Sequence, residues 1–341
     1  MINCIYKKNS MEWNDKIKNK LSKLDGKYSD SGQDLSSYLD GLLYSNPLYY
    51  WDYISLDTLL SLQQPKTDFP DEQIFIIYHQ ITELYFKLSL HEIEQISNNG
   101  KNISNDGKDL GWNKKLRVDF FIDRLNRINN YFEALIKSFG IMVNGMEKEQ
   151  FLKFRMSLLP ASGFQSAQYR LIEICTTDIN NLVQEDKRNS LINSKIADQA
   201  KHFYWMKGAV QLDTNKKTQM LENFEKKYMK IFIQKAEEFK NKNILFKYNS
   251  LSEKEKKDNN LITSLRQLDL NINVNWPLVH YKSAVRYLSL DENDIPATGG
   301  TNWQKYLPPR FQKRIFFPDL WTEDEKDNWG RQWVLSALKD S

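Results

Sequence analysis

Large apolar residues recur at helical spacing along this chain, and this pattern limits its possible fold more than any other feature. In residues 70–95 the recurring positions are Ile74, Ile77, Ile81, Leu84, Tyr85 and Leu88. Pro70, Asp71 and Glu72 suit a first helical turn, because proline lacks an amide donor and acidic groups favour the positive end of the helix dipole. The pattern predicts a long helix over residues 70–95.

Other segments carry the same pattern and complete an all-α outline. Further helices are expected over residues 53–64, 118–142 and 146–159, in charged stretches between 185 and 265, and from Pro277 to Leu288. Residues 96–110 are rich in Asn, Gly and Asp and are expected to form a loop. Because residues 1–40 are polar and weakly patterned, we expect an N-terminal arm over 1–40 and a single all-helical domain over 41–341.

Composition narrows the class of protein. The chain has 341 residues, of which 40% are apolar, so a sizeable core is expected. The 48 basic and 44 acidic residues are too evenly balanced to favour nucleic-acid binding. Neither a transmembrane helix nor a secretory signal is expected, because no long apolar run occurs. The 2 cysteines cannot form a disulfide framework or a zinc site, which favours a cytoplasmic location.

The 4 histidines limit any chemistry that needs an imidazole. His79 lies in the apolar stretch FIIYHQITELYFKL, one helical turn after Phe75. It is either a hydrogen-bonded core histidine or an imidazole that lines an apolar pocket beside an aromatic ring. His280 is followed one turn later by Ser283 and Ala284, which are small enough to admit a flat macrocycle. It is either the ligand of a non-covalent heme or a histidine near a helix start.

Two further positions invite a functional interpretation. Arg155 follows Phe151 by one helical turn, and its guanidinium could grip a carboxylate with two hydrogen bonds or merely extend to water. In ATGGT, Gly299 and Gly300 free the backbone beside Thr298, either to approach a ligand or only to form a flexible loop. Nucleotide-binding glycine loops and the His-Glu-x-x-His zinc motif are absent from the sequence.

Four blocks of the sequence resemble the tryptophan 2,3-dioxygenase family, within the heme-dependent indole and aromatic oxygenases. FIIYHQITELYFKL resembles the family's FIIQHQTSELW, and SGFQSAQYRLIE is similar to its SGFQSxQYRxIE. ATGGT resembles a GTGGS loop, and YWDYISLDTLLSLQQP resembles YGxYLxLDxLLSxQxP. The blocks occur in the family's order and span about residues 49–321.

The resemblance implies an activity, a cofactor and an assembly. The enzyme would be an oxidoreductase that inserts O2 across the indole C2=C3 bond of L-tryptophan, giving N-formylkynurenine in tryptophan catabolism by the kynurenine pathway. It would be an all-α homotetramer with one heme b (iron protoporphyrin IX) per subunit. By position, His280 would be the axial ligand of the heme iron, and Ser162 and Gly163 would lie beside the heme.

The resemblance also assigns substrate-binding residues. His79 would face O2 and the indole N–H as the catalytic histidine, and Phe75 and Phe151 would wall the indole pocket. Arg155 would hold the substrate carboxylate, and Thr298 would meet its ammonium group. Tyr50, Tyr53 and Ile54 would reach the site of a neighbouring subunit.

Several positions depart from the family pattern and keep other functions open. The family's Trp-Arg-Phe-Arg-His is here Trp276-Pro277-Leu278-Val279-His280, so two cations near the heme are missing. Ala297 replaces a glycine and Tyr78 replaces a glutamine, and the loop between His280 and Thr298 is a few residues longer. One alternative is a related heme oxygenase that acts on another indole or aromatic amino-acid derivative, or inserts one oxygen atom. The other is a non-catalytic helical binding protein.

Overall fold

A computed structural model describes residues 13–32, 34–45, 49–99, 101–107, 109–112, 114–158, 165–209, 216–288 and 313–330. The chain divides into two units, residues 1–62 and residues 63–341. The predicted division at residue 40 stays a prediction.

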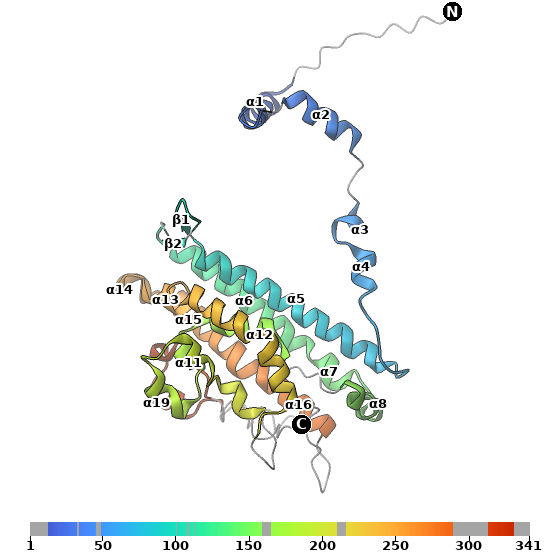
Figure 1. The fold of residues 1–341 in the computed structure, drawn as a ribbon, viewed down its shortest axis with the longest axis vertical. Helices are drawn as coiled ribbons and strands as arrows, with labels where there is room; N and C mark the ends of the chain where they lie inside the picture. Colours follow the sequence, from blue (N-terminus) through green and yellow to red (C-terminus); the bar gives the residue numbers. More distant parts are fainter. Residues whose placement is uncertain are drawn as a thin grey trace, which may run out of the picture. The chain divides into compact units, whose positions relative to one another are not determined.

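The N-terminal unit contains short helices that lack a core of their own (Figure 1). Its helices are α1 (Asp15–Ser29), α2 (Leu35–Tyr44), α3 (Tyr50–Tyr53) and α4 (Leu56–Leu60). None of the residues in these helices is buried. Asn14 and Asp34 cap α1 and α2 by accepting backbone N–H bonds from Ile17 and Ser37. Capping, rather than burial, therefore defines these helices locally.

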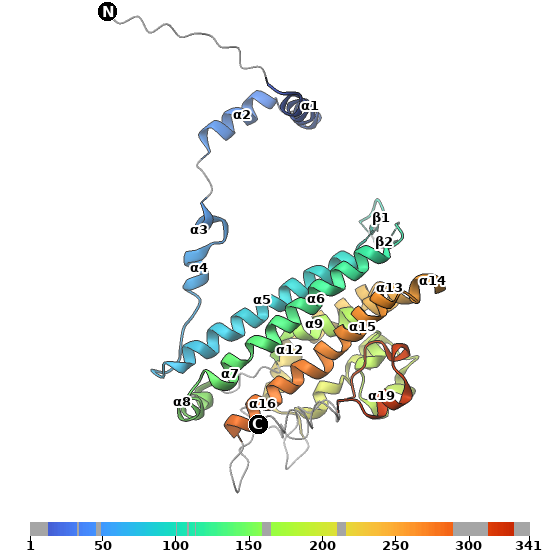
Figure 2. The same ribbon diagram turned by 180° about the vertical axis from the view of Figure 1, so that it is seen from behind.

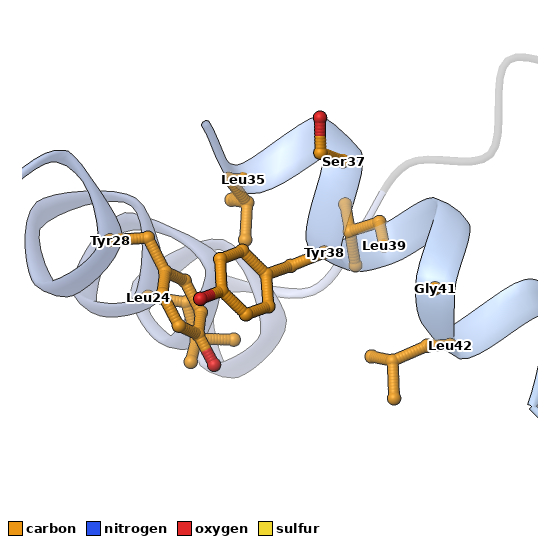
Figure 3. A pocket seen from close by; sticks show the side chains of 8 residues that line it. All are labelled: Leu24, Tyr28, Leu35, Ser37, Tyr38, Leu39, Gly41 and Leu42. Atoms are coloured by element: carbon orange, nitrogen blue, oxygen red, sulfur yellow. The ribbon is translucent and has the colours of Figure 1, made fainter. Parts of the chain in front are cut away.

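An apolar groove of about 420 Å³ lies between α1 and α2 (Figure 3). The rings of Tyr28 and Tyr38 stack there, with their centroids 3.6 Å apart. The helix predicted over residues 53–64 is partly wrong, because Ser55 adopts a left-handed conformation (φ 53°) between α3 and α4. That conformation interrupts the helix and splits it in two.

The second unit consists of helices around a common apolar core (Figure 2). Its α-helices are α5 (Asp71–Ser97), α6 (Val118–Ser138), α7 (Gly140–Asn144), α8 (Lys148–Phe154), α9 (Ala167–Thr176), α10 (Arg188–Leu191), α11 (Ile196–Ala200), α12 (Gln219–Phe239), α13 (Ile244–Asn249), α14 (Glu253–Lys256), α15 (Asn259–Leu270), α16 (Trp276–Leu288) and α19 (Glu323–Asp327). The 3₁₀ turns are η1 (Arg155–Leu158), η3 (Ile179–Leu182), η4 (Glu185–Lys187), η5 (Tyr204–Gly208) and η7 (Pro318–Leu320). The all-α prediction is confirmed.

A short antiparallel hairpin interrupts the helical pattern where a loop was predicted. It pairs β1 (Lys101–Ile103) with β2 (Asp109–Trp112). Among the described residues, none of the helices is both long and apolar enough to cross a membrane.

Helix α6 runs beside α5 and also packs against α15 (Figures 1 and 2). The core face of α6 is fully buried and consists of Phe121, Leu125, Ile128, Phe132 and Leu135. Burying each of these side chains contributes about 1.5–3 kcal/mol. On α5 the predicted long helix is confirmed, but its recurring residues Ile77, Ile81, Leu84 and Leu88 are 38–49% exposed. The core side of α5 carries Tyr78, Thr82, Phe86 and Ile93 instead.

A π-helix, η6 (Asn271–Asn275), joins α15 directly to α16. Its N–H groups bond five residues back, as Trp276 does to the carbonyl of Asn271. The predicted helix from Pro277 to Leu288 is confirmed, but the prediction that it opens at Pro277 is wrong. What the sequence did not indicate is that α16 continues from the preceding helix without a loop.

Two buried polar clusters attach residues 313–321 to this helical core. Glu173 on α9 accepts hydrogen bonds from Arg170, Tyr204 and Arg314, and all four side chains are buried. On α15, the buried Asp269 accepts the backbone N–H groups of Phe316 and Phe317, the indole N–H of Trp321 and the amide of Asn273. Because buried carboxylates require such partners, both clusters fix the C-terminal segment firmly.

Candidate functional site

His79 is held on α5 in a defined protonation pattern. Its Nδ1 lies 2.7 Å from the backbone carbonyl oxygen of Phe75, one helical turn earlier. A carbonyl only accepts hydrogen bonds, so Nδ1 donates and Nε2 keeps its lone pair. Burial lowers the pKa of His79, against the opposing effects of the Phe75 carbonyl and Glu83. His79 is therefore a neutral imidazole whose Nε2 can accept a hydrogen bond or bind a metal.

His280 repeats this arrangement on α16. Its Nδ1 lies 2.8 Å from the carbonyl oxygen of Trp276, and its ring lies 4.4 Å from that of Trp276 and 4.5 Å from that of Phe139. Burial and, to a smaller extent, the nearby imidazole of His79 lower the pKa of His280 to about 4, against the opposing effect of the Trp276 carbonyl. The two imidazoles are therefore near enough for a charge on one to act on the other.

Aromatic rings from three helices surround the two histidines. The ring of Phe75 lies 4.1 Å from that of His79 and 6.4 Å from that of Phe151 on α8. Phe151 in turn lies 4.6 Å from Tyr287, so that α8 packs on the helix that carries His280. The structure thus brings Phe75, His79 and Phe151 together, and their substrate-binding roles stay predictions.

Arg155 begins η1 directly after Phe154, whose ring lies 5.8 Å from that of Phe75. Only 6% of Arg155 is exposed, which does not fit a side chain that extends to water. Burial lowers the pKa of Arg155, because the charged guanidinium is partly removed from water. A buried guanidinium is suited to bind an anionic group.

The other predicted site residues belong to the N-terminal unit or lie outside the described residues. Tyr50, Tyr53 and Ile54 belong to the N-terminal unit, where Tyr50 is 70% and Tyr53 75% exposed. Ser162, Gly163 and Thr298 lie outside the described residues.

Several neighbours of the histidines were not found from the sequence. Phe139 and Tyr287 were missed because no local spacing links Phe139 to His280 or Tyr287 to Phe151. Trp276 could have been found, since it stands one turn before His280 on the same helix.

The site offers a neutral imidazole whose chemistry fits the ligand that a heme iron takes. Among the described residues, no group of three or more His, Cys, Asp or Glu side chains lies close enough together to hold a metal ion. A heme iron needs only one or two protein ligands, and a neutral imidazole with a free Nε2 lone pair suits that role. Burial raises the pKa of Cys175, which keeps this buried thiol protonated and unfit as a ligand.

Comparison with known proteins gives a consistent result. Residues 42–238 match the protein family described as tryptophan 2,3-dioxygenase. Proteins named tryptophan 2,3-dioxygenase are similar to parts of the chain. The one from Ruegeria sp. (strain TM1040) is 35% identical over 130 residues, which are 38% of this chain and 42% of the relative. The one from Bacillus anthracis is 38% identical over 124 residues, 36% of this chain and 39% of the relative.

A relative from Dictyostelium discoideum is 33% identical over 162 residues, 46% of this chain and 35% of that protein. The chain therefore spans less than half the length of these curated relatives.

The family match covers Phe75, His79, Phe151 and Arg155 and ends before His280, whose position at the site rests on the structure. The match extends over more than half of the 341 residues. The chain belongs to the tryptophan 2,3-dioxygenase family.

Proposed function

We propose that the protein is a heme-dependent dioxygenase that converts L-tryptophan and O2 to N-formylkynurenine, a step of tryptophan catabolism in the kynurenine pathway. The family and its relatives bear the name of this reaction, which supports the proposal. The observation that carries it is the pair of neutral imidazoles, His79 and His280, packed against aromatic rings. The burial of Arg155, at the end of the helix that carries Phe151, supports it. A cytoplasmic location stays a prediction.

His280 is the residue that we propose would hold the iron of heme b, with one heme per subunit. Its Nδ1–H bond to Trp276 fixes the ring orientation and leaves Nε2 as the ligating atom. When bound, the heme supplies the iron that activates O2. Ser162 and Gly163 are proposed to lie beside it, and the small residues Ser283 and Ala284 leave room one turn from the ligand.

His79 is proposed to orient the substrate rather than to remove a proton from it. The indole N–H only donates hydrogen bonds, and the Nε2 of His79 can only accept one in the tautomer fixed by Phe75. Indole is far too weak an acid to be deprotonated by an imidazole of lowered pKa. Phe75 and Phe151 would contact the faces of the indole ring and exclude water from it.

Arg155 and Thr298 are proposed to hold the amino-acid head of the substrate. The guanidinium of Arg155 suits a carboxylate, with which it can form two charge-assisted hydrogen bonds. Thr298 would meet the ammonium group. The carboxylate, the ammonium group and the indole N–H would each be held by one residue, and these three contacts would define the orientation of the indole ring. Positioning of this kind lowers an activation barrier by up to about 7–11 kcal/mol.

We also propose that the protein is a homotetramer in which Tyr50, Tyr53 and Ile54 reach a neighbouring subunit. The exposed aromatic rings of Tyr50 and Tyr53 and the absence of buried residues in helices α1–α4 support this arrangement. The exposed apolar side chains of α5 also favour a partner. Light scattering coupled to gel filtration tests it, and a monomer at micromolar concentration would contradict it.

The decisive experiment is an anaerobic purification followed by an assay with L-tryptophan and O2. We expect a coloured ferrous heme protein and the absorbance of N-formylkynurenine on admission of O2. With ¹⁸O2, mass spectrometry should find both labelled atoms in the product. One labelled atom would support the alternative oxygenase that inserts a single oxygen, and a colourless protein without turnover would support the non-catalytic binding protein. The presence of Arg155 favours an amino-acid substrate over a plain indole.

A further inference from the structure

Pro277 leaves a backbone carbonyl near the proposed heme ligand without its helical donor. In η6, Trp276 N–H bonds to the carbonyl of Asn271, five residues back. The same pairing one position later would join the N–H of residue 277 to the carbonyl of Ile272. Proline has no N–H, so the helix cannot make this bond. A buried carbonyl without a donor is costly, and another group must satisfy it.

The hydroxyl of Tyr169 occupies this position. It donates to the carbonyl oxygen of Ile272 at 2.9 Å, from α9, and it accepts a hydrogen bond from Arg314 at 3.2 Å. Burial raises the pKa of Tyr169, so the hydroxyl keeps the proton that it donates. Its ring lies 5.5 Å from Phe86, which in turn lies 5.8 Å from Trp276. The side chain is therefore held rigidly against η6.

The π-helix controls the atom that orients His280. The N–H of Trp276 bonds within η6, and its carbonyl accepts the Nδ1 proton of His280. A change in the pairing of η6 would move this carbonyl and would turn the imidazole with it. The side chain of Asn271 holds the other side of η6, by donating to Asn129 on α6 at 3.3 Å.

We propose that Tyr169 is a positioning residue for His280: it replaces the N–H that Pro277 lacks, holds η6 in its π pairing, and so aims the Nε2 of His280. Tyr169 is part of the family's SGFQSxQYRxIE pattern, whereas Pro277 stands where the family pattern has an arginine, so only the missing N–H at position 277 is particular to the present chain. The inference deepens the proposed function, on which the role of His280 as heme ligand rests.

Two substitutions test the linkage between Tyr169 and Pro277. Tyr169→Phe removes only the hydroxyl, whereas Pro277→Ala returns an N–H that can bond within the helix. Tyr248→Phe is a matched control, because Tyr248 has the same 8% exposure as Tyr169 and also donates to a carbonyl, that of Lys256. The heme-loaded ferrous proteins are compared by the iron–histidine stretching band in resonance Raman spectra.

We expect Tyr169→Phe to shift or broaden this band, and Tyr248→Phe to leave it as in the parent protein. The double variant Tyr169→Phe/Pro277→Ala should restore the parent band. A general loss of packing would not be rescued in this way. An unchanged band in Tyr169→Phe would overturn the proposal. So would a band shift in the double variant that is only the sum of the shifts caused by the two substitutions separately.

Amide hydrogen exchange gives a second measurement that needs no heme. In peptides covering residues 276–288 of the heme-free protein, Tyr169→Phe should speed exchange about tenfold, as expected for one lost buried hydrogen bond. The double variant should return to within about twofold of the parent protein. If the parent protein binds no heme, the proposed function fails, while this exchange experiment still decides whether Tyr169 holds η6.

Discussion

His79 and His280 share one hydrogen-bonding arrangement although they lie on different helices. Each donates its Nδ1 proton to the backbone carbonyl four residues earlier, at 2.7 Å in one case and 2.8 Å in the other. Each imidazole is therefore fixed in the tautomer that leaves Nε2 as a lone-pair donor. The Nε2 of His280 can therefore bind iron, whereas the Nε2 of His79 can accept a hydrogen bond from the indole N–H, although both residues are histidines.

Replacing His280 by alanine should remove the axial ligand of the proposed heme. We expect hemin affinity to fall by at least about 100-fold, because even groups that merely support a metal ligand are worth 10–100-fold. Titration with hemin, followed by the Soret absorbance, measures this. His91→Ala is the control, since His91 is exposed on α5. Equal affinities of the two variants would remove His280 from the ligand role.

Replacing Arg155 by alanine should weaken binding of the substrate carboxylate. Loss of a charge-assisted pair corresponds to about 1.5–3 kcal/mol, so KM for L-tryptophan should rise by roughly 10–150-fold. An indole substrate without a carboxylate should show a change of less than about threefold in KM. Steady-state kinetics with both substrates makes the comparison. A similar rise for both would mean that Arg155 supports the fold of the site rather than the carboxylate.

Acid should destabilise the heme-free protein through His280. Its pKa is about 4 in the folded protein and about 6.5 in an unfolded chain, so the unfolded chain binds the proton first as the pH falls. This contribution to stability is complete above pH 6.5 and is lost between pH 6.5 and 4, by up to about 3 kcal/mol. In His280→Gln the loss of stability on acidification should be correspondingly smaller. Urea unfolding of both proteins at pH 7 and pH 4.5 measures the difference, and parallel losses would contradict the assignment.

Replacing Asp269 by leucine should detach residues 316–321 from α15. The change leaves the N–H groups of Phe316 and Phe317 and the indole N–H of Trp321 without their acceptor. Each unsatisfied buried donor costs about 1–3 kcal/mol, so the free energy of unfolding should fall by about 3 kcal/mol or more. Urea denaturation provides the value. Asp327→Asn, at an exposed carboxylate, should change it by less than about 0.5 kcal/mol.

Helical spacing predicted the helices well but not which face of each helix is buried. On α6 the spaced residues Phe121, Leu125 and Phe132 form the core, as the pattern indicates. On α5 the conspicuous Ile and Leu residues are exposed, and the core side includes the polar Thr82 and Ser89. When a helix carries apolar residues on two sides, their spacing in the sequence predicts the helix but not its buried side. The helices that pack against it determine which side is buried.

The candidate site could be predicted where its parts are local in sequence. Phe75 and His79 stand one turn apart and meet as expected. Phe139 meets His280 only because α6 and α16 pack together, which no local spacing reveals. The π-helix was also invisible, because Asn271–Asn275 has no known sequence pattern and Pro277 alone indicated only a helix start.

The cluster around Glu173 has a consequence for the order in which the chain folds during synthesis. Glu173, Arg170 and Tyr204 leave the ribosome long before Arg314, which completes the cluster. Until Arg314 has been made, the carboxylate of Glu173 lacks its second guanidinium partner, and its burial away from water is unfavourable. The cluster around Glu173 can therefore be completed only after residue 314 has been synthesised.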